Sequence, residues 1–112
     1  MSEPVPSKDL VAASSRPLVL AVLARGENYG YELLREVERL SGGALAWREG
    51  MLYPVLHRLE REGLIESSWR VAETRKRRKY YALTRKGMEA LAAERAAWEA
   101  VDMTLRNAWG PA

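Results

Sequence analysis

The chain of 112 residues contains no cysteine and only one histidine, His57. Without cysteine there is no disulfide, no thiol nucleophile and no thiolate ligand for a metal, and a single histidine cannot build an imidazole site. Zinc fingers and Cys/His hydrolases are therefore excluded. The sequence also lacks a Walker loop, a G-x-G-x-x-G loop and an HExxH motif. We expect no enzymatic activity, no cofactor and no bound metal.

Long apolar runs are missing as well. Charged residues make up 29% of the chain and are spread through nearly all of it, so no segment approaches the roughly 18 to 20 apolar residues that a membrane-spanning helix needs. The first residues do not resemble a secretory signal. A chain of this length fits one domain of roughly 100 to 150 residues. We predict a small cytoplasmic protein with no membrane partner.

The positive charge is concentrated in one segment. The chain carries a net charge of +3, but residues 66–86 alone carry +6, while the segments before and after them are slightly acidic. The uninterrupted run Arg75–Lys79 would attract a polyanion, although such a run taken alone is more often a solvated loop. Arginine outnumbers lysine by 14 to 4, which favours forked contacts to phosphate or guanine.

The first part of the chain predicts an arm and two helices. Residues 1–9 contain two prolines and should form a flexible arm. A short buried helix is expected from about residue 16 to residue 23, with Ser15 as its cap and Pro17 in its first turn. The apolar stripe that begins at Tyr29 then predicts a second helix, which a glycine pair stops.

A third helix and a hairpin follow. Apolar residues recur at helical spacing from about Glu49 to Glu62, and Pro54 places the start of this helix close to Glu49. The spacing of side chains then changes from the helical period of 3.6 residues to the strand period of 2, both over residues 65–71 and over residues 79–83. This alternation predicts two strands joined by a basic loop.

Thr84 should cap a long final helix that runs to about Ala108. Three helices, a two-stranded β wing and a long helix make a mainly α, winged helix-turn-helix fold. We divide the chain into a flexible arm (1–9), a winged helix-turn-helix DNA-binding domain (10–84) and a C-terminal dimerisation helix (85–110).

Several segments resemble the PadR family of bacterial transcription regulators. They are Leu52–Ile65, Trp69, Arg78–Thr84 with Gly87, and Tyr29–Leu33, which looks like the start of the family's second helix. The length is similar to that of the short subfamily, which includes multidrug-sensing repressors of the lactococcal type. The resemblance implies a ligand-responsive repressor that dimerises through one C-terminal helix and binds a palindromic operator in double-stranded DNA.

Candidate DNA contacts lie on the polar sides of the third helix and at the wing tip. Around the glycine before Leu52, Arg48 and Met51 replace hydroxyl residues common in the family, so Arg48 is assigned to phosphate and Met51 to a thymine methyl. Arg48 and Met51 are equally well explained as exposed or packed residues. The alternative for Tyr53 is an aromatic wedge within the domain, and His57 is more often a satisfied surface or packing histidine. The assigned residues are Arg48, Met51, Tyr53, His57, Arg58, Arg75, Lys76 and Arg77.

The final helix carries more apolar surface than one small domain needs. A twofold homodimer would cover this surface, through Leu91, Trp98, Val101, Leu105 and Trp109. In multidrug-sensing relatives a tryptophan that resembles Trp98 stacks on flat aromatic ligands, and Asp102 lies one turn further along. A single tryptophan on such a stripe is more often a core residue. Trp47 and Trp69 are assigned to packing beside the hairpin.

We therefore predict a homodimeric, sequence-specific DNA-binding repressor that responds to a planar aromatic or hydrophobic effector. Two alternatives remain at the level of the sequence. One is a protein-interaction module that uses the winged fold without DNA. The other is a small-molecule-binding protein, or an adventitious enzyme, that has no specific affinity for DNA.

Overall fold

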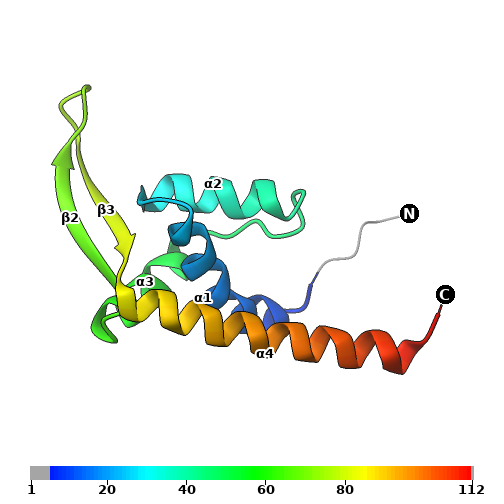
Figure 1. Cartoon of the computed structure of the whole chain (residues 1–112). Helices are drawn as coiled ribbons and strands as arrows, with labels where there is room; N and C mark the ends of the chain where they lie inside the picture. Colours follow the sequence, from blue (N-terminus) through cyan, green and yellow to red (C-terminus); the bar gives the residue numbers. More distant parts are fainter. Residues whose placement is uncertain (1–5, 112) are drawn as a thin grey trace.

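Helices dominate the structure, a computed structural model that describes residues 6–111, and a narrow hairpin projects from them (Figure 1). The predicted arm lies largely outside the described residues, and its last two residues are helical. The order confirms the predicted winged helix-turn-helix fold. The elements are α1 (Lys8–Ala24), β1 (Asn28–Tyr29), α2 (Gly30–Leu40), α3 (Glu49–Arg61), β2 (Ile65–Val71), β3 (Arg77–Leu83) and α4 (Arg85–Trp109).

Helix α1 begins two turns before the predicted start. Ser7 caps it by accepting a hydrogen bond from the backbone N–H of Leu10 at 3.2 Å. Pro17 lies inside the helix, and Ser15 is a buried helical residue whose hydroxyl donates to a carbonyl three residues earlier at 2.7 Å. The predicted cap was wrong because Ser and Pro mark a helix start only when the preceding residues do not continue the helix.

Helix α3 packs on the core along the predicted stripe. Leu52, Leu56 and Leu59 are each at most 1% exposed, and they contact buried residues of α1 and α2. The helix starts at Glu49, as Pro54 indicated. Because one stripe is buried, the remaining sides of α3 face away from the core.

Strands β2 and β3 form the wing, with a tighter turn than the sequence suggested. The loop spans only residues 72–76, so Arg77 already belongs to β3. The backbone N–H of Arg75 donates to the carbonyl of Ala72, and the N–H of Ala72 donates to that of Lys76, both at 2.8 Å. Arg75 has φ of 63°, a left-handed conformation that glycine adopts more readily.

A third strand joins the sheet, in the order β1-β3-β2. Residues Asn28 and Tyr29 pair with Tyr81 and Tyr80 of β3. Tyr29, which the sequence placed on the second helix, is therefore extended and precedes it. This strand fixes the start of α2 beside the wing.

Helix α4 begins as predicted, because the Thr84 hydroxyl accepts from the N–H of Gly87 at 3.0 Å. Gly87 touches the carbonyl of Leu64 so closely that a Cβ would overlap it. Of the residues in α4 only Gly87 is buried. The helix is roughly 37 Å long, and its second half extends beyond the rest of the fold (Figure 1).

Candidate nucleic-acid interface

A concave surface of about 440 Å³ lies between the start of α2, helix α3 and the wing. Aromatic and basic side chains share it. Its lining consists of Tyr29, Gly30, Tyr31, Tyr53, His57, Trp69, Lys76, Arg77, Arg78, Lys79 and Tyr81. We call this surface the wing groove.

The pleat of the hairpin places Trp69, Arg77 and Lys79 on one face of the wing and Arg78 on the other. Directly opposed residues of an antiparallel pair share a face, so Trp69 and Lys79, which are opposed, lie on the same face as Arg77. The same face is tied to α3, because Glu60 accepts a hydrogen bond from Ser67 and lies 3.9 Å from the Lys79 ammonium. The wing therefore stands beside the polar side of α3.

Tyr53 of α3 reaches the start of α2 because residue 30 is glycine. A Cβ on Gly30 would lie 2.7 Å from the Tyr53 hydroxyl oxygen. Tyr53 is 37% exposed, and its ring lies 6.5 Å from that of His57, one turn further along α3. The contact makes Gly30 a steric requirement for the position of Tyr53.

Several basic residues of helix α3 and the wing have no carboxylate partner. Among residues 6–111, no carboxylate lies within 4.0 Å of six of them, whereas Lys79 in the groove pairs with Glu60; Lys8, Arg61, Arg85 and Lys86 also lack a partner. The six are Arg48, Arg58, Arg75, Lys76, Arg77 and Arg78. Clustered cations without local counter-charges produce a positive potential that attracts polyanions.

Two of these cations are held against aromatic rings. The guanidinium of Arg77 lies 5.1 Å from the centre of the Trp69 ring, and that of Arg78 lies 4.5 Å from the centre of the Tyr29 ring. A guanidinium stacked on a ring keeps its N–H donors at the edge. The edges are then free for phosphate or base acceptors.

The structure brings together some of the predicted DNA contacts and separates others. Tyr53, His57, Lys76 and Arg77 line the wing groove. Three other candidates are exposed outside its lining: Arg48, which precedes α3, Arg58 and Arg75. Met51 is half-buried and packs against the core.

Sequence reasoning missed the rest of the wing groove. Trp69 was assigned to packing but is 59% exposed, so that interpretation was wrong; Trp47 is 8% exposed and does pack in the core. Tyr29 and Tyr31 carried a signal in the family-like segment at the start of α2, but no role was assigned to them. Tyr81 is 1% exposed, and burial raises the pKa of its phenol.

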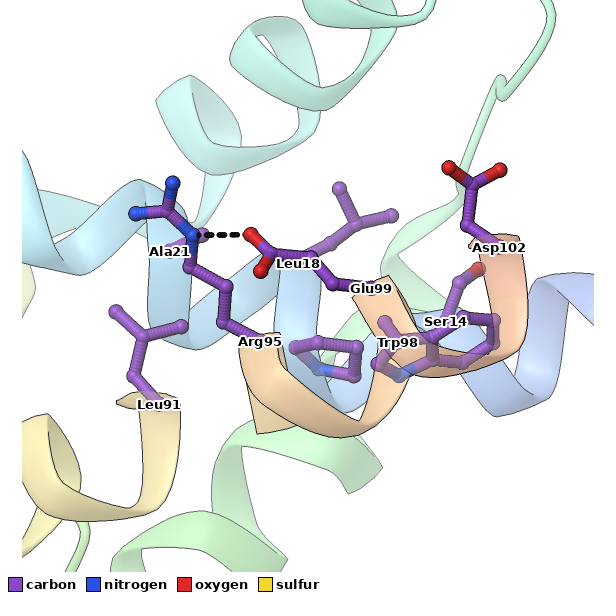
Figure 2. Close-up of a pocket in the computed structure, with 9 residues that line it drawn as sticks. Ser14, Leu18, Ala21, Leu91, Arg95, Trp98, Glu99 and Asp102 are labelled. Carbon is purple, nitrogen blue, oxygen red and sulfur yellow. Dashed lines mark hydrogen bonds and ion pairs between the residues drawn. The ribbon is translucent and has the colours of Figure 1, made fainter. Parts of the chain in front are cut away.

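A second, more apolar groove of about 710 Å³ lies between α1 and α4, well away from the wing. Figure 2 shows Leu18 and Ala21 on α1 and Trp98 on α4, which passes in front of α1. We call this surface the Trp98 groove. It is lined by Ser14, Pro17, Leu18, Ala21, Leu91, Arg95, Trp98, Glu99 and Asp102.

Three of the predicted residues of the last helix line the Trp98 groove. They are Leu91, Trp98, which is 36% exposed, and Asp102, whose carboxylate pairs with Arg106 at 2.9 Å. The other residues of the predicted dimerisation stripe lie outside the groove and are exposed, with Trp109 at 70%. These others are Val101, Leu105 and Trp109.

Neither a membrane span nor a metal site is found in residues 6–111. None of the helices is both long and apolar enough to cross a bilayer. No three side chains among His, Asp and Glu gather in this part of the chain as metal ligands would.

Residues 19–93 match the Transcriptional regulator PadR-like family. A transcriptional regulator of Mycobacterium tuberculosis is 39% identical over 82% of each chain. A transcriptional regulator of Escherichia coli is 30% identical over 81% of this chain but only 42% of its own length. A PadR-like transcriptional regulator from Bacillus cereus superposes with a TM-score of 0.82 at 30% identity, covering 94% of this chain and 100% of the other.

Proposed function

The chain belongs to the PadR-like family of transcriptional regulators, and on that premise we propose a homodimeric repressor that binds a palindromic operator and responds to an aromatic effector. The family consists of DNA-binding regulators, and the named relatives are regulators rather than enzymes. The finer parts of the proposal are the DNA contacts, the dimer and the effector. Each is supported by a different surface of the structure.

The wing groove carries the DNA-binding proposal. In this proposal α3 enters the major groove with Tyr53, His57 and Arg58 toward the DNA, and Arg48 contacts a phosphate at the start of the helix. Arg75, Lys76 and Arg77 hold the adjoining backbone or minor groove. The unpaired cations in a concave, aromatic-lined surface are the single observation that supports this role most strongly. Met51 supports α3 from the core side, since it is half-buried.

Binding to two duplexes tests this role. One duplex comes from the DNA upstream of the protein's own gene and the other has the same composition in random order. A specific regulator binds the first at least about 10³-fold more tightly at physiological salt. Equal and weak binding to both, with little response to salt, would instead support a protein-interaction module.

The exposed half of α4 carries the dimer proposal. Val101 is 50% exposed and Leu105 is 42% exposed, on the side of the helix that also carries Trp98. Pairing of this surface with its own copy around a twofold axis closes the assembly. The two α3 helices then lie roughly 34 Å apart and reach half-sites one turn apart. In this proposal residues 85–110 dimerise and residues 10–84 bind DNA.

Sedimentation analysis of two variants tests the dimer. Leu105→Glu places a charge in the proposed interface and should give monomers at micromolar concentration. Ala100→Glu introduces the same charge on the opposite side of α4, where the residue is exposed, and should leave the dimer intact. Identical sedimentation of both variants would contradict the assignment.

The Trp98 groove carries the effector proposal. Its size is in the range of small-molecule sites, roughly 300 to 1,000 Å³, and an indole forms part of its wall. A flat aromatic molecule stacks on the Trp98 ring, while Asp102 attracts a cationic substituent. The effector changes the separation of the two DNA-binding domains of the dimer. It alters the DNA affinity by no more than the ratio of its own affinities for the DNA-bound and free arrangements.

Titration with Nile red, a neutral planar dye, tests this groove. Trp98→Ala should abolish the dye's fluorescence increase, whereas Trp69→Ala, a change at an exposed tryptophan of the wing, should preserve it. Equal titrations of the two variants would remove the proposal. Tight binding that leaves the DNA affinity unchanged would instead support a small-molecule-binding protein.

A further inference from the structure

Arg16 of α1 bridges two carboxylates from different helices. Its Nη1 atom lies 2.7 Å from Oε2 of Glu62, at the end of α3, and its Nε atom lies 3.3 Å from Oε1 of Glu94, on α4. Arg16 and Glu94 have side chains that are 35% and 26% exposed. One guanidinium therefore joins α1, α3 and α4 at a partly covered position, where solvent screens the pairing less than at the open surface.

Glu94 is also bonded to the wall of the Trp98 groove. Its second oxygen, Oε2, accepts a hydrogen bond from the indole Nε1 of Trp98 at 3.2 Å. The two oxygens of this carboxylate thus have different partners, Arg16 on one side and Trp98 on the other. A movement of the indole changes the position at which Glu94 meets Arg16.

Glu62, the other carboxylate that pairs with Arg16, is the C-terminal cap of α3. Its backbone N–H donates to Arg58 at 3.0 Å, and its carbonyl accepts from the Lys86 ammonium at 2.9 Å. A carboxylate at a helix C-terminus is destabilised by the partial negative charge of the helix dipole there. The charge of Arg16 offsets that repulsion, so the last turn of α3 depends on where Arg16 lies.

We propose that Arg16 is a positioning residue that couples the Trp98 groove to the recognition helix α3. The path runs from the Trp98 indole through Glu94 and Arg16 to Glu62. The inference rests on the proposed function, because it gives the effector site a route to the DNA-reading helix. When a flat ligand stacks on Trp98 and turns the indole, Glu94 loses a donor, Arg16 redistributes between its two carboxylates and the end of α3 shifts.

Hydrogen exchange in the intact protein without ligand tests the path itself. The probes are the backbone amides of residues 62–64, which all bond to the last turn of α3. Trp98→Phe removes the indole N–H while keeping an aromatic ring at the position, and Arg16→Gln removes the bridge. Each should speed exchange at these amides by about fivefold. The double variant should exchange no faster than Arg16→Gln alone, because both changes break one path.

Two controls separate the path from general destabilisation. The amide of Leu56, in the buried part of α3, should be unaffected by either change. Arg95→Gln removes an arginine that lines the Trp98 groove and, among residues 6–111, pairs only with Glu99 on the same helix at 2.8 Å; it should leave exchange at residues 62–64 unchanged. Unaltered exchange in Trp98→Phe, or effects that multiply in the double variant, would overturn the proposal.

Nile red supplies the link to function. In the wild type, saturating dye should change exchange at residues 62–64, and in Arg16→Gln the dye should bind with similar affinity without that change. A dye that binds both proteins and alters residues 62–64 equally would overturn the coupling role of Arg16. If the dye does not bind, only the effector proposal is contradicted. The path from Trp98 to Glu62 is tested separately, by comparing the single and double variants without any ligand.

Discussion

Removal of the wing's charge should change how DNA binding depends on salt. The triple variant Arg75→Ala, Lys76→Ala and Arg77→Ala removes three cations that have no carboxylate partner among residues 6–111. Because these cations are not neutralised within the protein, each is free to displace a counterion from a DNA phosphate. Their loss should therefore weaken binding to every sequence.

The expected magnitude follows from the number of cations. Each phosphate contact adds roughly 0.9 to the slope of log K against log salt concentration. A dimer presents two wings, so complete loss of their phosphate contacts reduces the slope by about 5, whereas a monomer would show a reduction of about 3. Fluorescence anisotropy of a labelled 30-base-pair duplex, measured between roughly 50 and 200 mM salt, gives the slope directly.

A second triple variant with the same change in net charge provides the control. Arg25→Ala, Arg39→Ala and Arg106→Ala remove arginines that are paired with carboxylates and lie outside the wing groove. This variant should keep the wild-type slope to within about one unit. Equal slopes for the two triple variants would refute the assignment of the wing to the DNA backbone.

Three further predictions concern the fold around the site. Gly87→Ala should lower the free energy of unfolding by about 1 to 3 kcal/mol, because the added Cβ would overlap the Leu64 carbonyl. Gly50→Ala adds a Cβ in open space and should not lower it. Equal denaturation midpoints for the two variants would contradict this packing. Arg75→Gly should raise the free energy of unfolding by about 1 kcal/mol by relieving the left-handed backbone, and a decrease would argue against the turn described here. Burial raises the pKa of Tyr81 above the ordinary 10.0, so the stability that its neutral phenol contributes is present below pH 10 and is lost as the pH rises through the folded pKa. In an absorbance titration of the tyrosines, Tyr81→Phe should remove the step at highest pH. An unchanged final step would contradict the burial of this phenol.

Local signals in the sequence predicted the elements that present the site. The stripe of α3 and the change of period at Ile65 each reflect burial on one face. Thr84 was recognisable as a cap because its hydroxyl satisfies a backbone N–H within three residues. Interactions of this range are encoded by neighbouring residues, so a single sequence reveals them.

Elements that depend on distant partners were not predictable in the same way. Strand β1 has two residues, too few to show a period, and it exists because Tyr29 pairs with Tyr80 fifty-one positions later. The start of α1 was misplaced because Pro17 is an equally good signal for a first turn. Trp69 was interpreted as buried from its residue type, although its position toward the tip of the wing leaves it exposed.

The candidate site likewise has a part that local sequence signals predict and a part that depends on distant partners. The charge of the wing groove was evident from Arg75–Lys79, because a basic run needs no fold to be noticed. Apart from Tyr53, its aromatic half was not, since Tyr29 comes to lie beside β3 only through the pairing of β1 with β3. The bridge formed by Arg16 was also hidden, because its two carboxylates are 46 and 78 residues away.

The central claim is that two copies of α3 and the wing face one side of a duplex. Hydroxyl-radical footprinting on the DNA upstream of the protein's own gene tests it most directly. Two protected patches on the same side of the helix, centred one turn or about 10 base pairs apart, are the predicted result. A single patch, or protection that the wing triple variant leaves unchanged, would contradict it.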